Sequence, residues 1–140
     1  MIIFRILSLL LTLCLAAVPA MAETVLSKYL AEVPAADLVQ GADGFGAIRN
    51  DIAVAPVLKG AETIGWAFVT SDFVGTTGYS GKPIHTLVAV DKDAKISGVS
   101  LVKHSEPIVL IGIPEAKVKA LVAAYIGLDH AAHAVVLVPI

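Results

Sequence analysis

The chain has 140 residues, of which 57% are hydrophobic and 16% are charged, and its formal net charge is −2. This length is suited to one domain, and the apolar content is sufficient for a packed core without covalent cross-links. Arginine occurs only at positions 5 and 49, and no basic stripe is present to meet a phosphate backbone, which argues against a nucleic-acid-binding protein.

Residues 1–22 have the features of a secretory signal peptide. One positive charge, Arg5, precedes an apolar run over residues 6–18, and the segment closes on the small residues Ala20 and Ala22. The run is shorter than the ~20 residues that a helix needs to cross a membrane. We therefore expect cleavage after residue 22 and export to the periplasm. The alternative is an uncleaved segment that anchors the chain in the inner membrane.

The single cysteine, Cys14, lies inside this leader. The chain that remains after cleavage has no cysteine, which excludes disulfides, Cys-ligated zinc and iron–sulfur clusters. His130 and His133 lie three residues apart, but no third ligand is apparent, and a zinc site needs at least three protein ligands. We therefore predict no metal site.

After the leader, residues 24–33 predict an amphipathic helix, with Thr24 as its N-cap and Pro34 at its end. Residues 54–60 and 63–70 then predict two strands joined by a tight turn. On the second strand, large and small side chains alternate. We expect the large residues to face a core and the small ones to allow close approach of a backbone or a flat ligand. The large residues are Ile64, Trp66 and Phe68, and the small ones are Gly65 and Ala67.

Residues 84–91 and 96–104 predict a second hairpin, and Gly98 within it predicts a bulge or a close approach. Residues 105–114 predict an irregular loop. A helix follows from Pro114 to about residue 126, with Gly127 as its C-cap. Its apolar residues have the spacing of a buried stripe: Val118, Leu121, Val122 and Tyr125. This order of elements predicts a single α+β domain with a mainly antiparallel, twisted sheet and flanking helices.

The stretch GTTGYSG, residues 75–81, is the first candidate binding segment. It does not fit a nucleotide P-loop, because five residues separate Gly75 from Gly81 where the motif has four, and because a strand follows where the motif has a helix. It also lacks the dinucleotide fingerprint. Its glycines allow successive N–H groups to turn toward one anion, as in a backbone nest. The alternative is a plain flexible loop.

The stretch KHSEP, residues 103–107, is the second candidate segment. A histidine and a glutamate flank a serine where the last predicted strand leads into an irregular loop, a placement that is common at ligand sites. No nucleophile and base can be paired from the linear order of the residues, since such a constellation is defined by geometry. We therefore predict no catalytic residue and no turnover by this chain alone.

From residue 41 to Asp129 the sequence resembles the FMN-binding domain at the exported N-terminus of NosR/NirI-type proteins, which are regulators and electron donors of nitrous oxide and nitrite respiration. More distantly, its G-Y-S-G-x-P-I and H-x-E-x elements are similar to the flavin subunits of sodium-pumping NADH:quinone reductase and Rnf complexes. The resemblance implies two groups of cofactor-binding residues. The first group would line the flavin pocket: Gly78, Tyr79, Ser80 and Gly81. The second group would approach the isoalloxazine ring or its phosphate arm: His104, Ser105, Glu106 and Pro107.

The sequence departs from this family at its C-terminal side. The family's S-G-A-T segment, whose threonine carries FMN through a phosphoester bond, does not occur in these 140 residues. We therefore expect a C-terminally truncated FMN-binding domain over residues 23–129 and a divergent tail over residues 130–140.

Two functional interpretations remain open. In the first, the chain is an exported FMN-binding module for electron transfer to, or maturation of, nitrous oxide reductase, together with membrane-bound electron-transfer components. The chemistry would belong to the flavin, and the protein would orient it and tune its potential. In the second, the chain is a truncated non-redox remnant or an interaction domain that has lost the flavin.

Overall fold

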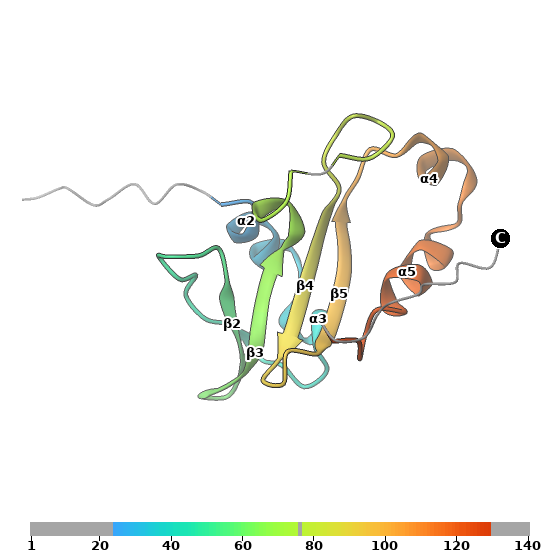
Figure 1. The fold of residues 1–140 in the computed structure, drawn as a ribbon. Helices are drawn as coiled ribbons and strands as arrows, with labels where there is room; N and C mark the ends of the chain where they lie inside the picture. The colour runs from blue at the N-terminus through green and yellow to red at the C-terminus, as the bar shows by residue number, and fades with distance from the viewer. Residues whose placement is uncertain (1–23, 76, 130–140) are drawn as a thin grey trace, which may run out of the picture.

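A computed structural model describes residues 24–75 and 77–129. They form one five-stranded antiparallel sheet in the order β1-β2-β3-β4-β5, with helices against one face and beyond one edge (Figure 1). The strands are β1 (Gly44–Phe45), β2 (Ala55–Lys59), β3 (Glu62–Val69), β4 (His85–Asp91) and β5 (Ile96–Lys103). The helices are α2 (Val25–Glu32), α3 (Ala35–Leu38), the 3-10 helix η1 (Thr70–Asp72), α4 (Pro107–Gly112) and α5 (Glu115–Ala123). The predicted α+β class is confirmed.

Helix α2 begins where the sequence predicts it, because two side chains satisfy N–H groups of its first turn. The Thr24 hydroxyl accepts a hydrogen bond from the Ser27 N–H (3.2 Å), as expected of an N-cap. The Asp72 carboxylate accepts a second bond from the Leu26 N–H (3.1 Å). Since Asp72 belongs to η1, the second bond also fixes the start of the helix against the end of β3.

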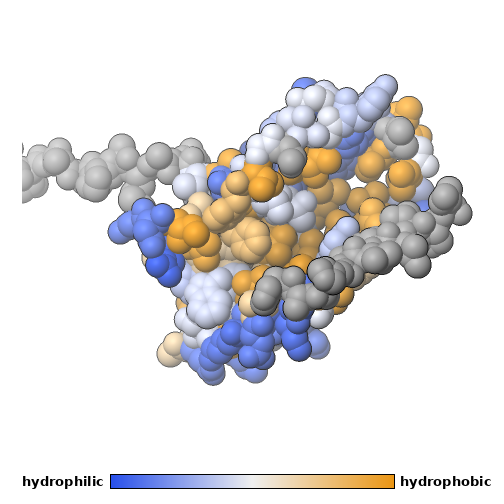
Figure 2. Space-filling view, viewed as in Figure 1, coloured by the Kyte–Doolittle hydropathy of each residue, from blue (hydrophilic) through white to orange (hydrophobic). Residues whose placement is uncertain are grey.

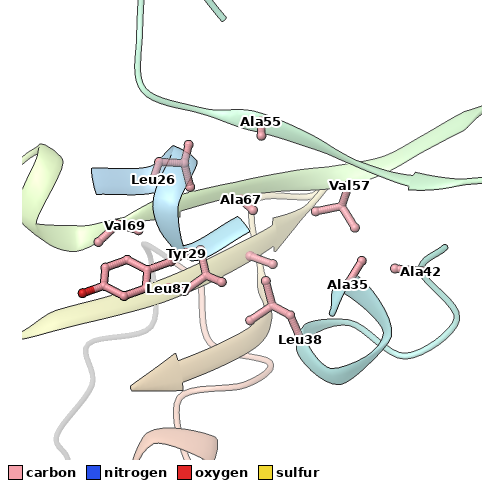
Figure 3. Close-up of a cluster of buried hydrophobic side chains, with 11 residues drawn as sticks. Leu26, Tyr29, Ala35, Leu38, Ala42, Ala55, Val57, Ala67, Val69 and Leu87 are labelled. Atoms are coloured by element: carbon pink, nitrogen blue, oxygen red, sulfur yellow. The ribbon is translucent and has the colours of Figure 1, made fainter. Parts of the chain in front are cut away.

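The hydrophobic core lies between the sheet and the helices α2 and α3 (Figure 3). Leu26 and Tyr29 of α2 and Leu38 of α3 are buried against the central strands β3 and β4. The largest fully buried side chains are Leu26, Val57, Val69 and Leu87. The domain thus consists of two packed layers, one formed by the helices α2 and α3 and the other by the five-stranded sheet.

The prediction for the two faces of β3 is wrong. Its buried face carries the small residues Gly65 and Ala67, whereas Trp66 and Phe68 lie half-buried on the opposite face. The face of β3 that packs into the core is the one that also carries Val69, which is fully buried, and only at Gly65 is the neighbouring backbone too close for a side chain. A Cβ at Gly65 would collide with the main-chain carbonyl of Val90, so the predicted close approach at the small face is confirmed.

Gly98 has the same role on β5, as the sequence predicts. A Cβ at this position would collide with the main-chain carbonyl of Leu38, the last residue of α3. Helix α3 therefore rests directly on the β5 backbone, and only glycine leaves space for it.

Residues 104–128, which we call the α4–α5 arm, lie beyond the β5 edge of the sheet (Figure 1). The predicted loop at residues 105–114 is wrong, since residues 107–112 form α4. The predicted buried stripe of α5 is wrong as well, because no residue of α5 is buried and Leu121 is 47% exposed. Among residues 24–75 and 77–129 no second layer lies opposite the arm, and its apolar side borders a groove.

The end of the arm is bonded to the beginning of β5. The Gly127 N–H donates to the Ile96 carbonyl (2.7 Å), and the Ile96 N–H donates to the Leu128 carbonyl (2.9 Å). Gly127 has φ +89°, a left-handed conformation that favours glycine. The two main-chain hydrogen bonds fasten the end of the arm to the first residue of β5. The prediction that Gly127 caps the helix is wrong, because α5 ends at Ala123 with Ala124 as its C-cap; Gly127 instead closes the arm onto the sheet.

Candidate functional site

The two predicted binding segments meet at one end of the sheet. Strands β4 and β5 are antiparallel neighbours, and their register pairs His85 with Lys103. The loop that precedes β4 and the segment that follows β5 must therefore share one end of the hairpin. Residues 78–81 and 104–107, which are far apart in the sequence, lie together there.

The loop that carries residues 78–81 is a compact turn. An isolated antiparallel bridge pairs Thr77 with Pro83 at its base. Inside it, the Gly78 N–H donates to the Lys82 carbonyl (3.1 Å), and the Gly81 N–H donates to the Gly78 carbonyl (3.0 Å). Gly81 has φ +70°, which explains why the turn has a glycine at this position.

The carboxylate of Glu106 binds this turn through three hydrogen bonds. The Tyr79 N–H donates to Glu106 Oε2 (3.0 Å), and the Ser80 N–H donates to Glu106 Oε1 (3.4 Å). The Ser80 hydroxyl also donates to Oε1 (2.8 Å). Successive amides that converge on one anion are the defining feature of a backbone nest. In this structure the anion in the nest is a side chain of the same chain.

Gly78 allows the carboxylate to come this close. A Cβ built at Gly78 would overlap the carboxylate group of Glu106. Gly78 contributes empty space beside the nest, and Gly81 contributes a backbone conformation. The two glycines of the G-Y-S-G element therefore have separate physical roles.

The same contacts lower the pKa of Glu106. The main cause is the hydrogen bond from the Ser80 hydroxyl. Partial desolvation is the next largest influence and raises the pKa, but the amides of Ser80 and Tyr79 and the electrostatic influence of His104 lower it further, so the net shift is downward. Each of these donors stabilises the charged carboxylate, which is why the acid form is disfavoured.

This shift makes the contact between Glu106 and the loop sensitive to acid. A carboxyl group with a lowered pKa stabilises the folded state above its unfolded pKa of about 4.3, and this contribution is lost as the pH falls through the folded value. We expect the amide NMR signals of Tyr79 and Ser80 to titrate together as the pH is lowered, with a midpoint below the ordinary glutamate value of about 4.3. Glu106→Gln should abolish this titration. A midpoint at or above 4.3 would contradict the assignment.

The other predicted residues of the second segment lie around Glu106. The Glu106 N–H donates to Nδ1 of His104 (3.4 Å), which leaves Nε2 to carry the proton of the neutral imidazole. Ser105 is half-buried between these two residues, and Pro107 is the first residue of α4. Pro107 is favourable there because the first N–H of a helix has no partner within the helix.

A groove of about 1210 Å³ runs between β5 and the α4–α5 arm, and His104 lines it. We call it the β5–arm groove. Figure 2 shows hydrophobic side chains gathered between the sheet and the arm. The apolar lining comes from β5 and from both helices of the arm, and it includes Val99, Leu101, Val109, Val118, Val122 and Ile126. Charged residues also line it: Glu32, Asp37, Lys103, Glu115 and Lys119. A concave site that combines apolar side chains with polar groups is the usual form of a small-molecule site.

A polar pair that the sequence did not reveal lies beside the core. The Ser71 hydroxyl is 2.6 Å from Nδ1 of His85. The centroids of the His85 and Tyr29 rings are 5.7 Å apart. These contacts connect η1, β4 and α2. Ser71 and His85 are 14 residues apart and match no motif, so only the fold could bring them together. We interpret the pair as structural, since the serine hydroxyl gives a half-buried histidine nitrogen a hydrogen-bond partner.

Some kinds of site are absent from the described residues. Within residues 24–75 and 77–129, no three His, Cys, Asp or Glu side chains are grouped so that they could hold a metal ion. None of the helices in these two ranges has the length and hydropathy to cross a membrane. The predicted signal peptide and both His130 and His133 lie outside the described residues.

Three curated proteins resemble the chain. It is 40% identical over 92 residues to the regulatory protein NosR of Pseudomonas aeruginosa, covering 66% of this chain and 13% of that protein. It is 37% identical over 101 residues to NosR of Stutzerimonas stutzeri, covering 72% and 14%. It is 36% identical over 128 residues to the protein NirI of Paracoccus denitrificans, covering 89% and 18%. No family model and no solved structure matches the chain.

These similarities support a NosR/NirI-type regulator region, as the sequence motifs predict. The chain spans less than a fifth of the length of each curated relative that it matches. The similarity therefore concerns one region of those proteins and not their full length. Binding of FMN by the residues described above stays a prediction.

Proposed function

We propose that this chain is an exported FMN-binding module with a role in nitrous oxide or nitrite respiration, in electron transfer to the reductase or in its maturation. The observation that carries the proposal is the meeting of the two predicted flavin segments next to the β5–arm groove. Glu106 bonds to Tyr79 and Ser80, and the neighbouring His104 lines the groove. The similarity to NosR and NirI supports the respiratory role.

The groove suits a flavin in size and in chemistry. Its volume of about 1210 Å³ is sufficient for a ligand of this size, since typical ligand pockets have about 300–1,000 Å³. The side chains of Val118 and Val122 would contact the ring faces, and their apolar surface would exclude water. His104, with Nε2 protonated, would offer a hydrogen-bond donor to a polar edge of the ring.

A bound flavin would supply one-electron and two-electron chemistry, and the residues of this chain would supply its surroundings. An apolar wall disfavours charge on a nearby ring, whereas a donor such as His104 favours negative charge on an oxygen or nitrogen that it contacts. The balance of the two influences sets the reduction potential. The partners we propose are membrane-bound electron-transfer components or the reductase itself.

The test is the visible spectrum of the domain, purified after export from cells with FMN available. We expect flavin absorbance that is lost from the protein on denaturation, because the S-G-A-T attachment segment does not occur in this sequence. A denaturing gel viewed for flavin fluorescence should show a dark protein band. Fluorescence on that band would reveal an attachment residue in this chain. A colourless protein that cannot be reconstituted with FMN would overturn the proposal.

A second candidate function is that of an interaction domain without flavin. The exposed apolar residues of α4 favour it, since Leu110 is 67% exposed and Ile111 is 87% exposed. Leu110 and Ile111 are adjacent, and exposed apolar side chains that form a contiguous patch often mark a site of association. Binding of a protein partner by a colourless domain, lost when Ile111 is changed to Ser, would support this function over the first.

A further inference from the structure

We propose that the amide nest of Tyr79 and Ser80 is a binding site for a phosphate monoester, and that Glu106 is its internal ligand, which must leave before a phosphate enters. For the phosphate of FMN, this inference rests on the proposed function. For inorganic phosphate it does not, so the two can be tested separately.

The donors of the nest fit an oxyanion. Two consecutive main-chain N–H groups and one hydroxyl converge on the same carboxylate, at 3.0, 3.4 and 2.8 Å. A phosphate presents oxygens that accept the same kind of hydrogen bond from the same directions. The carboxylate of Glu106 therefore stands in for the group that the nest is built to hold.

Glu106 is a ligand that can be exchanged. It comes from a different segment, 26 residues after Ser80, and it is only half-buried. The ion pairs among the described residues join Arg49 to Asp51, Lys92 to Glu62 and Lys119 to Glu115, so none of them holds Glu106. Hydrogen bonds to the loop fix its position. Rotation of one side chain would empty the nest without any change in the main chain.

A phosphate and the carboxylate cannot share the nest. Both are anions, and like charges in contact repel each other. The wild-type chain should therefore bind a phosphate weakly, in competition with its own side chain. Emptying the nest should strengthen the binding of a phosphate ligand and leave an otherwise identical ligand without phosphate unaffected.

Two variants empty the nest in different ways. Glu106→Ala removes the carboxylate. Gly78→Ala retains it but places a Cβ where the carboxylate lies, and the end of a flexible side chain can move away. Matched controls are Glu62→Ala, which removes the same charge at the opposite end of the sheet, and Gly75→Ala, which adds a Cβ in the same loop where nothing lies within 4 Å.

The experiment has two arms, applied to the wild type and all four variants. In the first arm, inorganic phosphate is titrated while backbone amide NMR signals are recorded. We expect the Tyr79 and Ser80 signals to move at a phosphate concentration at least about tenfold lower in Glu106→Ala and Gly78→Ala than in the wild type and the controls. In the second arm, FMN and riboflavin are titrated by flavin fluorescence. We expect FMN, but not riboflavin, to bind the two nest variants at least about tenfold more tightly.

The outcomes separate the inference from the proposed function. If phosphate leaves the Tyr79 and Ser80 signals unmoved in both nest variants, with their folded spectra retained, the inference is overturned. It is also overturned if FMN and riboflavin weaken equally in both variants, since Glu106 would then be a structural latch for a flavin site that still exists. If no flavin binds any variant, the proposed function fails, and the phosphate arm alone decides the inference.

Discussion

Gly98→Ala is expected to destabilise the domain by about 1–3 kcal/mol, because the added methyl group has no space. Its Cβ would collide with the main-chain carbonyl of Leu38, and a main-chain atom cannot rotate away as a side chain can. Helix α3 would have to lift from β5, which would expose the buried side chains of Ala35 and Leu38. Urea unfolding followed by circular dichroism measures the effect as a lower midpoint.

The matched control is Gly44→Ala. Gly44 also lies in a strand, but nothing lies within 4 Å of the position of its Cβ, and its φ is not in the left-handed region. We expect an unchanged or slightly higher midpoint, because alanine restricts the unfolded chain. Equal midpoints for the two variants would show that α3 does not rest on β5 as described.

A pair of tryptophans in the β5–arm groove is expected to weaken FMN binding at least about tenfold, which equals about 1.4 kcal/mol. Val118 and Val122 lie one turn apart on α5, are half-buried and line the groove. The double variant Val118→Trp/Val122→Trp would occupy the space that we propose for the flavin ring. Fluorescence titration with FMN measures the loss.

The control moves the same two side chains to the outer face of α5. Ala116 and Ala120 are also one turn apart, are exposed and do not line the groove. Ala116→Trp/Ala120→Trp should bind FMN as the wild type does. If both pairs bind FMN equally well, the flavin ring does not lie in the β5–arm groove, and the fit described above is wrong.

The sequence predicts the central elements of this fold well because their signals are local. The cap at Thr24 sets the start of α2, and the predicted second hairpin, residues 84–91 and 96–104, agrees with β4 and β5 to within one residue. The predicted close approaches at Gly65 and Gly98 are also confirmed. A glycine within a strand is unfavourable unless a neighbour needs the space, so its presence carries information about packing.

The prediction fails where burial depends on what lies opposite. The spacing of Val118, Leu121 and Val122 is that of an amphipathic helix, but spacing alone does not reveal whether a second layer faces the stripe. In this structure α5 lies past the last strand, and Leu121 stays exposed. Helix α4 was missed for a different reason, since an apolar segment with proline and glycine at its ends has the composition of a loop.

The residues of the candidate site could be predicted from the sequence, but the contacts between them could not. Residues 78–81 and 104–107 were named from their motifs, and the antiparallel pairing of β4 with β5 explains why they meet. The hydrogen bonds of Glu106 were not predictable, because they join a turn to a segment 26 residues further along the chain. The sequence suggests a nest for an anion, but only the fold shows which anion of the chain reaches it.

The α4–α5 arm is attached to the sheet at both ends of a single strand. It continues directly from Lys103, and it is held at the other end by main-chain bonds between Gly127, Leu128 and Ile96. The distance between its two attachments is thus set by the length of β5, roughly 23 Å from the first to the last of its eight residues. Since both attachments are to the same strand, the β5–arm groove is bounded by one strand and by an arm whose two ends that strand holds.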